Sequence, residues 1–217
     1  MCNLYDVGPR RQQRGGVGWD DMVADYLECL EKDCGIRKTD PGPVMLHDPD
    51  GQITISTMRW GFARHFNPAI NNARGDKLGG MWRPAWEARR CLVPVRTFYE
   101  WTGKKGSKQT HAFQAGDGGV YLYVAGLWEK NRDPEIGNCF TMVTCDASEQ
   151  VAPIHDRMPA ILDAEAGRVY LDADDPVDLI RPWQGELRIF SCANPLRDPV
   201  GHRGPVPVSD PALPGFE

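Results

Sequence analysis

The chain has 217 residues, of which 41% are hydrophobic and 25% charged, and this size and composition predict one globular domain with its own core. Its net charge of −5 argues against a surface that binds nucleic acid everywhere, because phosphate contacts need Lys and Arg. The chain has no run of about 18 uncharged apolar residues and no signal-peptide pattern at its beginning, so we expect a cytoplasmic protein without a membrane partner.

The first predicted helix covers residues 18–35, where acidic residues can cap the start and Gly35 can end it. Its apolar residues share one face: Met22, Val23, Tyr26, Leu27 and Leu30. A proline-rich crossing with a turn follows at residues 39–52, and a looser stretch covers residues 65–80.

Strands dominate the rest of the chain. They are predicted at residues 53–62, 91–95, 97–102, 111–115, 120–130, 139–147 and 187–193, with a tight hairpin over residues 114–124. Short helices are predicted at residues 81–90 and 162–172. Runs of strands with helices between them predict an α+β fold rather than a doubly wound sheet.

The seven cysteines indicate reduced thiols, not a disulfide framework. The closest pairs, Cys29 with Cys34 and Cys139 with Cys145, lack the spacing and the matching histidines of a zinc site. We therefore expect no metal.

Charge is unevenly distributed along the sequence. Basic residues outnumber acidic ones between Arg59 and Lys108, whereas acidic residues gather in residues 19–33 and in the C-terminal third. This pattern predicts a local basic surface on an acidic protein.

Four short stretches carry polar groups that a purely structural explanation does not predict together. They are Cys2, "NNAR" at 71–74, "FYEW" at 98–101 and "PIHDRMPAIL" at 153–162. Taken singly, Cys2 fits an incidental residue of a frayed end, and Asn72 and Arg74 fit a solvated loop. His155 taken singly fits a hydrogen-bonded structural histidine. Glu100 is different, because alternation in a strand places its carboxylate on the same face as apolar neighbours.

Together these stretches resemble the SOS-response-associated peptidase (SRAP) family, whose members process abasic sites in DNA. The family's motifs appear in order as "MC", "NAR" at 72–74, "RCLVPVRTFYEW" at 90–101 and "IHDRMPAIL" at 154–162. The resemblance implies one domain over residues 1–217 of mostly antiparallel, barrel-like sheets flanked by a few helices. The motifs occupy residues 2–162, and a C-terminal helix, strand and tail occupy residues 163–217.

The sequence departs from the family at three places, one of which is the family's Tyr-Asn-Val-Ala-Pro stretch, which has no clear counterpart in residues 35–46. Members often have Gly-Arg after the cysteine, whereas Asn3 and Leu4 stand here. The family's paired tryptophans ahead of the Asn-Ala-Arg motif are replaced by "ARHF", which leaves Phe66 as the expected ring for stacking on a base.

The resemblance implies a reaction of Cys2 after removal of Met1. An α-amine has a pKa of about 8 and attacks the aldehyde of an abasic sugar, after which the adjacent thiol closes a thiazolidine ring. Glu100 and His155 are implied as proton donors and acceptors, and Asn72 as the residue that orients the terminus or the sugar.

The implied partner is single-stranded DNA containing an abasic site, and the chemistry needs no metal or organic cofactor. Contacts with the strand are implied for Arg74, Phe66, Arg59, Arg64 and Arg157. The sequence does not indicate protein partners.

Other functions fit some of the same residues. An N-terminal-nucleophile amidohydrolase of the glutaminase type also exposes such a cysteine but needs an oxyanion hole. A thiol peptidase that uses Cys2 and His155, with removal of its own first residue, is a second alternative. A non-catalytic protein that binds single-stranded DNA is a third.

Overall fold

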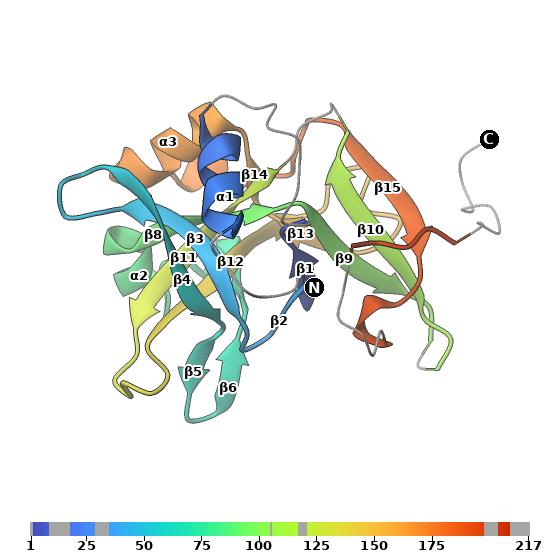
Figure 1. Ribbon diagram of the computed structural model, residues 1–217, viewed down its shortest axis with the longest axis horizontal. Helices are drawn as coiled ribbons and strands as arrows, with labels where there is room; N and C mark the ends of the chain where they lie inside the picture. Colours follow the sequence, from blue (N-terminus) through green and yellow to red (C-terminus); the bar gives the residue numbers. More distant parts are fainter. Residues whose placement is uncertain are drawn as a thin grey trace.

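The computed structural model describes residues 2–8, 18–28, 35–104, 106–116, 121–197 and 204–208. Its centre is a barrel of five strands (Figure 1). These strands are β3 (Pro41–His47), β4 (Ile53–Trp60), β8 (Arg90–Val95), β11 (Leu122–Lys130) and β12 (Asn138–Asp146). The ring closes because β12 pairs with β11 on one side and, in parallel, with β4 on the other.

Three short strands extend the barrel near β12 and β11. They are β7 (Asn72–Arg74), β13 (Arg157–Pro159) and β14 (Ile161–Leu162). Strand β7 runs parallel to β12, with Asn72 opposite Met142, and β13 pairs with the end of β12. The "NAR" and "IHDR" motifs, which lie far apart in the sequence, are therefore held at neighbouring positions of one strand.

A second, antiparallel sheet stands beside the barrel (Figure 1). Its order is β15 (Leu187–Cys192), β10 (Gln109–Ala115), β9 (Thr97–Thr102), β1 (Leu4–Asp6) and β2 (Gly35–Arg37). Strand β8 continues into β9 through Arg96, whose backbone N–H donates to the Asp6 carbonyl at 2.8 Å. Because β1 pairs with β9, the connection from β8 to β9 places strand β1, and with it Cys2, where the barrel and the second sheet join.

Three helices cover the barrel: α1 (Trp19–Glu28), α2 (Arg83–Ala88) and α3 (Ala164–Asp172). Helix α1 buries Trp19, Val23 and Leu27, which recur every four residues and so share one face. Helix α3 begins after Asp163, whose side chain accepts a hydrogen bond from the Ala166 N–H. Short 3₁₀ turns are η1 (Gly75–Lys77), η2 (Val177–Leu179) and η3 (Pro195–Arg197).

Alternation along β9 separates two hydrophobic clusters. Phe98 belongs to the large core and stacks on Phe113 at 4.5 Å, whereas Tyr99 belongs to a small cluster on the other face. Glu100 therefore faces the large core, as its sequence position predicts.

The predicted α+β fold with barrel-like antiparallel sheets is confirmed, and the strands and helices lie near their predicted positions. The prediction of a proline-rich crossing was wrong, because residues 41–47 form strand β3, with Val44 and Met45 fully buried. Its prolines stand at the start of the strand, where they are tolerated. The loose stretch at 65–80 likewise contains strands β6 (Asn67–Ile70) and β7.

The predicted end of the first helix was also wrong in one respect, because Gly35 begins strand β2. The predicted hairpin over residues 114–124 was wrong, because β10 pairs with β9 and β15 whereas β11 pairs with β8, β12 and β14, so the two strands belong to different sheets. Residues 29–34, which include Cys29 and Cys34, and residues 117–120 lie outside the described residues. Within the described ranges, no helix has the length and apolar character needed to cross a membrane.

Candidate active site around Cys2

Cys2 lies just before strand β1 and is only 1% exposed. Its thiol donates a hydrogen bond to the Leu4 carbonyl at 3.1 Å. Burial, together with the negative charge of Glu100, raises the pKa of the Cys2 thiol to about 12. The sulfur is therefore a neutral thiol at pH 7, and the Glu100 carboxylate lies close enough to act on it.

Two neighbouring asparagines hold the backbone of Cys2. The Nδ2 atoms of Asn71 and Asn72 both donate to the Cys2 carbonyl, at 2.8 and 3.0 Å. Asn71 is itself fixed, because its own carbonyl accepts from Trp60 Nε1 and from the Met142 N–H, each at 3.1 Å. The position of Cys2 is thus set by groups that the barrel holds rigidly.

The Asn72 side chain has a second polar atom that the protein does not use. Its Oδ1 is buried and has no hydrogen-bond partner in the described part of the chain. A buried carbonyl oxygen in this state can accept a hydrogen bond from a ligand hydroxyl at little cost.

Glu100 is 3% exposed on strand β9. Burial raises the pKa of its carboxyl to about 7, and the negative charge of Asp156 contributes to the increase. A carboxyl group of this pKa is present in both protonation states at neutral pH, which is what a group that accepts and returns a proton needs.

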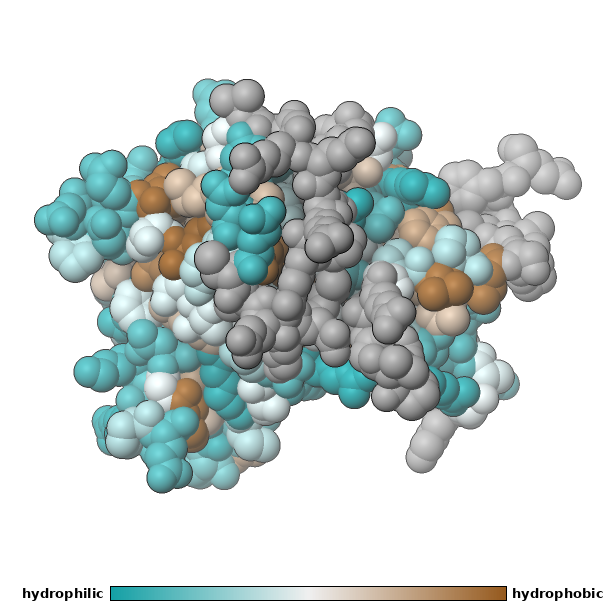
Figure 2. Space-filling model, in the orientation of Figure 1, coloured by the Kyte–Doolittle hydropathy of each residue, from teal (hydrophilic) through white to brown (hydrophobic). Residues whose placement is uncertain are grey.

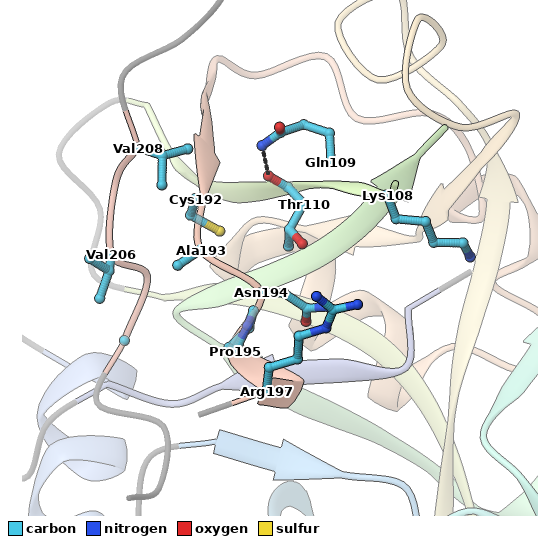
Figure 3. A pocket seen from close by; sticks show the side chains of 11 residues that line it. Lys108, Gln109, Thr110, Cys192, Ala193, Asn194, Pro195, Arg197, Val206 and Val208 are labelled. Carbon is cyan, nitrogen blue, oxygen red and sulfur yellow. Dashed lines mark hydrogen bonds between the residues drawn. The ribbon is translucent and has the colours of Figure 1, made fainter. Parts of the chain in front are cut away.

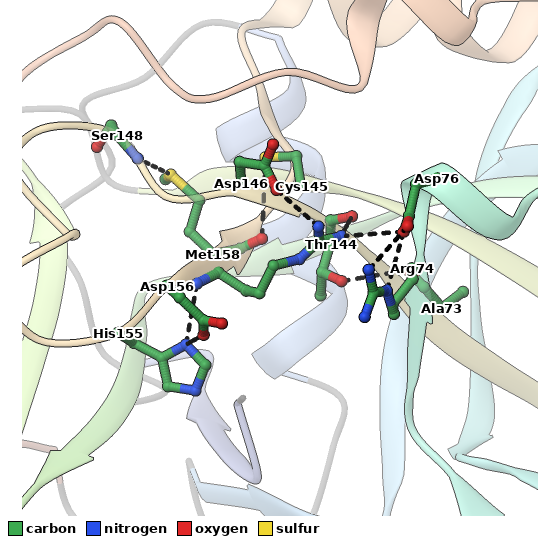
Figure 4. Close-up of polar contacts among 11 residues, drawn as sticks. Ala73, Arg74, Asp76, Thr144, Cys145, Asp146, Ser148, His155, Asp156 and Met158 are labelled. Atoms are coloured by element: carbon green, nitrogen blue, oxygen red, sulfur yellow. Dashed lines mark hydrogen bonds and ion pairs between the residues drawn. The ribbon is translucent and has the colours of Figure 1, made fainter.

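His155 lies on the turn that leads from β12 to β13 (Figure 4). Its Nδ1 accepts from the Arg157 N–H at 3.0 Å and is 2.9 Å from a carboxylate oxygen of Asp156. Burial lowers the pKa of the imidazole, and the Asp156 carboxylate partly opposes this effect. Because the negative charge of Asp156 also raises the pKa of Glu100, the loop that carries His155 lies within electrostatic reach of Glu100.

Two of the predicted DNA-contacting arginines, Arg74 and Arg157, are paired with carboxylates, and Figure 4 shows Arg74 beside Asp76. Arg74 donates from Nε and Nη2 to the two carboxylate oxygens of Asp76, at 2.9 and 2.7 Å. Arg157 donates to Asp146 at 2.7 Å and to the Thr144 carbonyl at 2.9 Å. The Arg74 side chain is 54% exposed and that of Arg157 only 12%, so Arg74 is the more accessible of the two.

The other three predicted DNA-contacting residues belong to the hairpin of β5 (Phe62–Arg64) and β6, or to its base. Arg59 donates to the carbonyls of Gly61 and Pro68, and Arg64 forms a two-fold ion pair with Glu129. Phe66 is 63% exposed between the two strands. Both arginines thus already stabilise the hairpin, and their contact with DNA stays a prediction.

Sequence reasoning missed two residues at the site. The "NNAR" stretch predicts a role for Asn72 and gives no separate signal for Asn71, the first of its two asparagines. His111 is buried on β10 directly opposite Glu100, and its Nε2 lies 2.8 Å from Thr102 Oγ1. The pairing of β9 with β10 brings His111 to the same face as Glu100, and this register was not read from the sequence.

The other described cysteines are free and buried: Cys91, Cys139, Cys145 and Cys192. Over the described ranges, no group of three or more His, Cys, Asp or Glu side chains is arranged to hold a metal ion.

The fold defines a single-domain α+β protein in which a barrel joins a second sheet. At this junction, the site places a buried cysteine beside a carboxyl group whose pKa is raised. The sequence profile of the SOS response associated peptidase (SRAP) family matches residues 5–196. The chain belongs to this family.

Several relatives carry the description "abasic site processing protein". The Gallus gallus protein HMCES is 32% identical over 186 residues, which cover 65% of this chain and 55% of that protein. The Xenopus tropicalis HMCES is 30% identical, with 79% of this chain and 64% of that protein covered. Escherichia coli YedK is 25% identical over 79% of each chain. The chain thus spans less than two thirds of the length of the two HMCES proteins.

Solved structures share the fold. A Bordetella bronchiseptica protein has a TM-score of 0.71 at 21% identity, with 89% of this chain and 100% of that chain covered. A Bacteroides thetaiotaomicron protein has a TM-score of 0.67 at 19% identity, with 89% of each chain covered.

Proposed function

We propose that this protein processes abasic sites in single-stranded DNA by forming a covalent thiazolidine with Cys2 after Met1 has been removed. The observation that carries the proposal is the way Cys2 is held, with its carbonyl bound by Asn71 and Asn72 and its thiol beside Glu100. Relatives described as abasic site processing proteins support the substrate class.

The reaction has two bond-forming steps. The neutral α-amine of Cys2 adds to the aldehyde carbon of the ring-opened sugar, and loss of water gives an imine. The Cys2 sulfur then adds to the imine carbon, and the thiol proton ends on the nitrogen. Neither step needs an oxidant, a reductant or a thiolate formed in advance, which suits a thiol whose pKa is about 12.

Proton transfer falls to Glu100 and His155. With a pKa near 7, Glu100 accepts the proton that the amine loses and returns it to the departing hydroxyl group. His155, whose Nδ1 has both a donor and an acceptor within reach, assists opening of the sugar ring. The unpartnered Oδ1 of Asn72 is suited to accept from a sugar hydroxyl.

The strand itself is bound by groups around the site. The exposed Arg74 stands next to Asn72 in β7 and exchanges its Asp76 partner for a backbone phosphate. Phe66, on the exposed hairpin, stacks on a base. Arg59 and Arg64 support that hairpin, and Arg157 holds the loop of His155.

The raised pKa of Cys2 counts against a preformed thiolate in the peptidase and glutaminase alternatives. Both need a thiolate or a base that removes the thiol proton before attack on an amide. Burial and the charge of Glu100 oppose that ionisation.

The direct test is to incubate the protein with a single strand that contains one abasic site. We expect a complex that survives a denaturing gel, with an intact mass equal to protein without Met1 plus DNA minus one water. An undamaged strand of the same sequence is the control. A protein that retains Met1, or that forms no covalent product, would contradict the proposal.

Asn71 offers a second test, because it holds Cys2 without being part of the family motif. We expect Asn71→Asp to slow cross-linking by roughly 10-fold or more, since a buried hydrogen bond is lost and a carboxylate faces the Cys2 carbonyl. The same negative charge should raise the pKa of the α-amine and shift the rate profile to higher pH. Asn71→Leu removes the bond without the charge, so it should slow the reaction without this shift. Rate profiles that coincide for the two variants would refute the assignment.

A further inference from the structure

A cavity of about 560 Å³ opens on the second sheet, on the face opposite to Glu100 (Figure 3). Its place follows from the strand register. His111 pairs with Glu100 on one face, so its neighbour Thr110, opposite Trp101 and Cys192, belongs to the other face. The residues that line it come from β10, β15 and the segment after β15: Lys108, Gln109, Thr110, Cys192, Ala193, Asn194, Pro195, Arg197, Gly204, Val206 and Val208.

The charged side chains that line this cavity are positive. They are Lys108 and Arg197, and no acidic side chain of the described residues lines it. Neither cation forms an ion pair with a described residue, in contrast to Arg64, Arg74 and Arg157. The described part of the protein therefore does not neutralise the positive charge here, although the chain as a whole is acidic.

The floor of the cavity contains hydrogen-bond donors. Thr110 is 1% exposed, and its Oγ1 has no hydrogen-bond partner among the described residues. Asn194 uses its Oδ1 to accept from the Leu196 N–H at 3.1 Å, which leaves its amide NH₂ as a donor. A buried hydroxyl without a partner costs folding free energy, and a ligand oxygen would remove that cost.

The opposite wall is apolar. Val206 and Val208 are 64% and 41% exposed, and Figure 3 shows them across the cavity from Lys108. Figure 2 shows hydrophobic side chains gathered on this side of the molecule, near the end of β15. The Cys192 thiol between the two sides has a pKa raised to about 11, first by burial, so it stays neutral and does not repel an anion.

We propose that this cavity binds the phosphate of a nucleotide, with Lys108 and Arg197 as its cations, Thr110 as its buried donor and the valines against the sugar or base. The nucleotide is either a free mononucleotide or part of a DNA strand. The site lies on the other face of the sheet from Cys2, so it does not depend on the proposed cross-linking.

The test is titration of the full chain, by phosphorus NMR and calorimetry, with inorganic phosphate, a mononucleotide and an undamaged single-stranded oligonucleotide. We expect the double variant Lys108→Ala, Arg197→Ala to weaken binding by roughly 10-fold or more, and Thr110→Val to weaken it without lowering the melting temperature. Thr110→Val keeps the shape of the side chain and breaks no hydrogen bond of the described protein. Lys104→Ala, an exposed cation of the same hairpin that does not line the cavity, is the matched control.

If the double variant binds the mononucleotide more weakly than the unmodified chain does, the cavity takes a free nucleotide. If only its binding of the oligonucleotide is weakened, the cavity takes a DNA strand. An equal loss in Lys104→Ala would show a diffuse charge effect and overturn the proposal. Failure of every phosphate probe to bind the unmodified chain would overturn it as well. Cross-linking to an abasic strand would be intact in either case, so this failure is distinct from failure of the proposed function.

Discussion

Cys2→Ala is expected to abolish the denaturation-resistant complex with an abasic strand. The variant keeps an α-amine and can still form an imine, but it has no sulfur to close the ring, and an imine reverses in water. Borohydride should therefore trap the variant on DNA, whereas without reductant no complex should remain on a denaturing gel. This pair of results separates the role of the nitrogen from that of the sulfur.

Cys145→Ala is the matched control for the loss of a thiol. Cys145 is also buried, lies on β12, and has a thiol pKa raised to about 12 by burial. We expect it to cross-link at the rate of the unmodified protein. A stable complex in Cys2→Ala without reductant, or an equal loss in Cys145→Ala, would argue against the thiazolidine.

Glu100→Gln is expected to slow cross-linking by roughly 100-fold or more, the usual contribution of one group in acid–base catalysis. The pKa of Glu100 is about 7 in the folded protein, so the carboxylate that accepts the amine proton is lost as the pH falls below this value. The rate of the unmodified protein should rise through about pH 7. The variant should lack this rise and keep only the one that belongs to the α-amine, near pH 8.

The same substitution has a predictable effect on stability, which guards against confusing slow chemistry with poor folding. The folded pKa of Glu100 lies above the ordinary value of about 4.3, so protonation favours the folded state. The corresponding stability is present below about pH 4 and is lost as the pH rises to about 7. Glu100→Gln should therefore melt no lower than the unmodified protein at about pH 8. Slow cross-linking with a lowered melting temperature would instead indicate a folding defect.

Local patterns predicted most of the elements, because apolar spacing is a property of short segments. Helix α1 and strands β8 to β12 follow from such spacing. Strand β3 was missed because Pro41 and Pro43 imitate a turn, and the burial of Val44 depends on partners that the sequence does not reveal. The closure of the barrel, which joins β12 to β4 in parallel, has no local signal at all.

The residues of the site likewise divide into those with a local sequence signal and those whose position depends on distant contacts. Glu100 was found from its place in an alternating strand, and Cys2, Asn72 and His155 from short motifs. The role of Asn71 depends on a hydrogen bond across 69 positions of the chain, and the position of His111 opposite Glu100 depends on the register of two strands. The pairing of Arg157, whose side chain is only 12% exposed, with Asp146 also shows that a basic residue in a sequence need not be available to a ligand.

The parallel pairing of β7 with β12 has a consequence for the stage of folding at which Cys2 is held in a fixed position. Asn72 and Met142 lie far apart in the sequence, so their pairing exists only in the tertiary structure, and such non-local contacts are associated with slow folding. The groups that position the nucleophile are thus completed together with the tertiary structure. A partly folded chain would carry the same amine and thiol in no fixed orientation, and capture of a damaged sugar would begin only with the finished molecule.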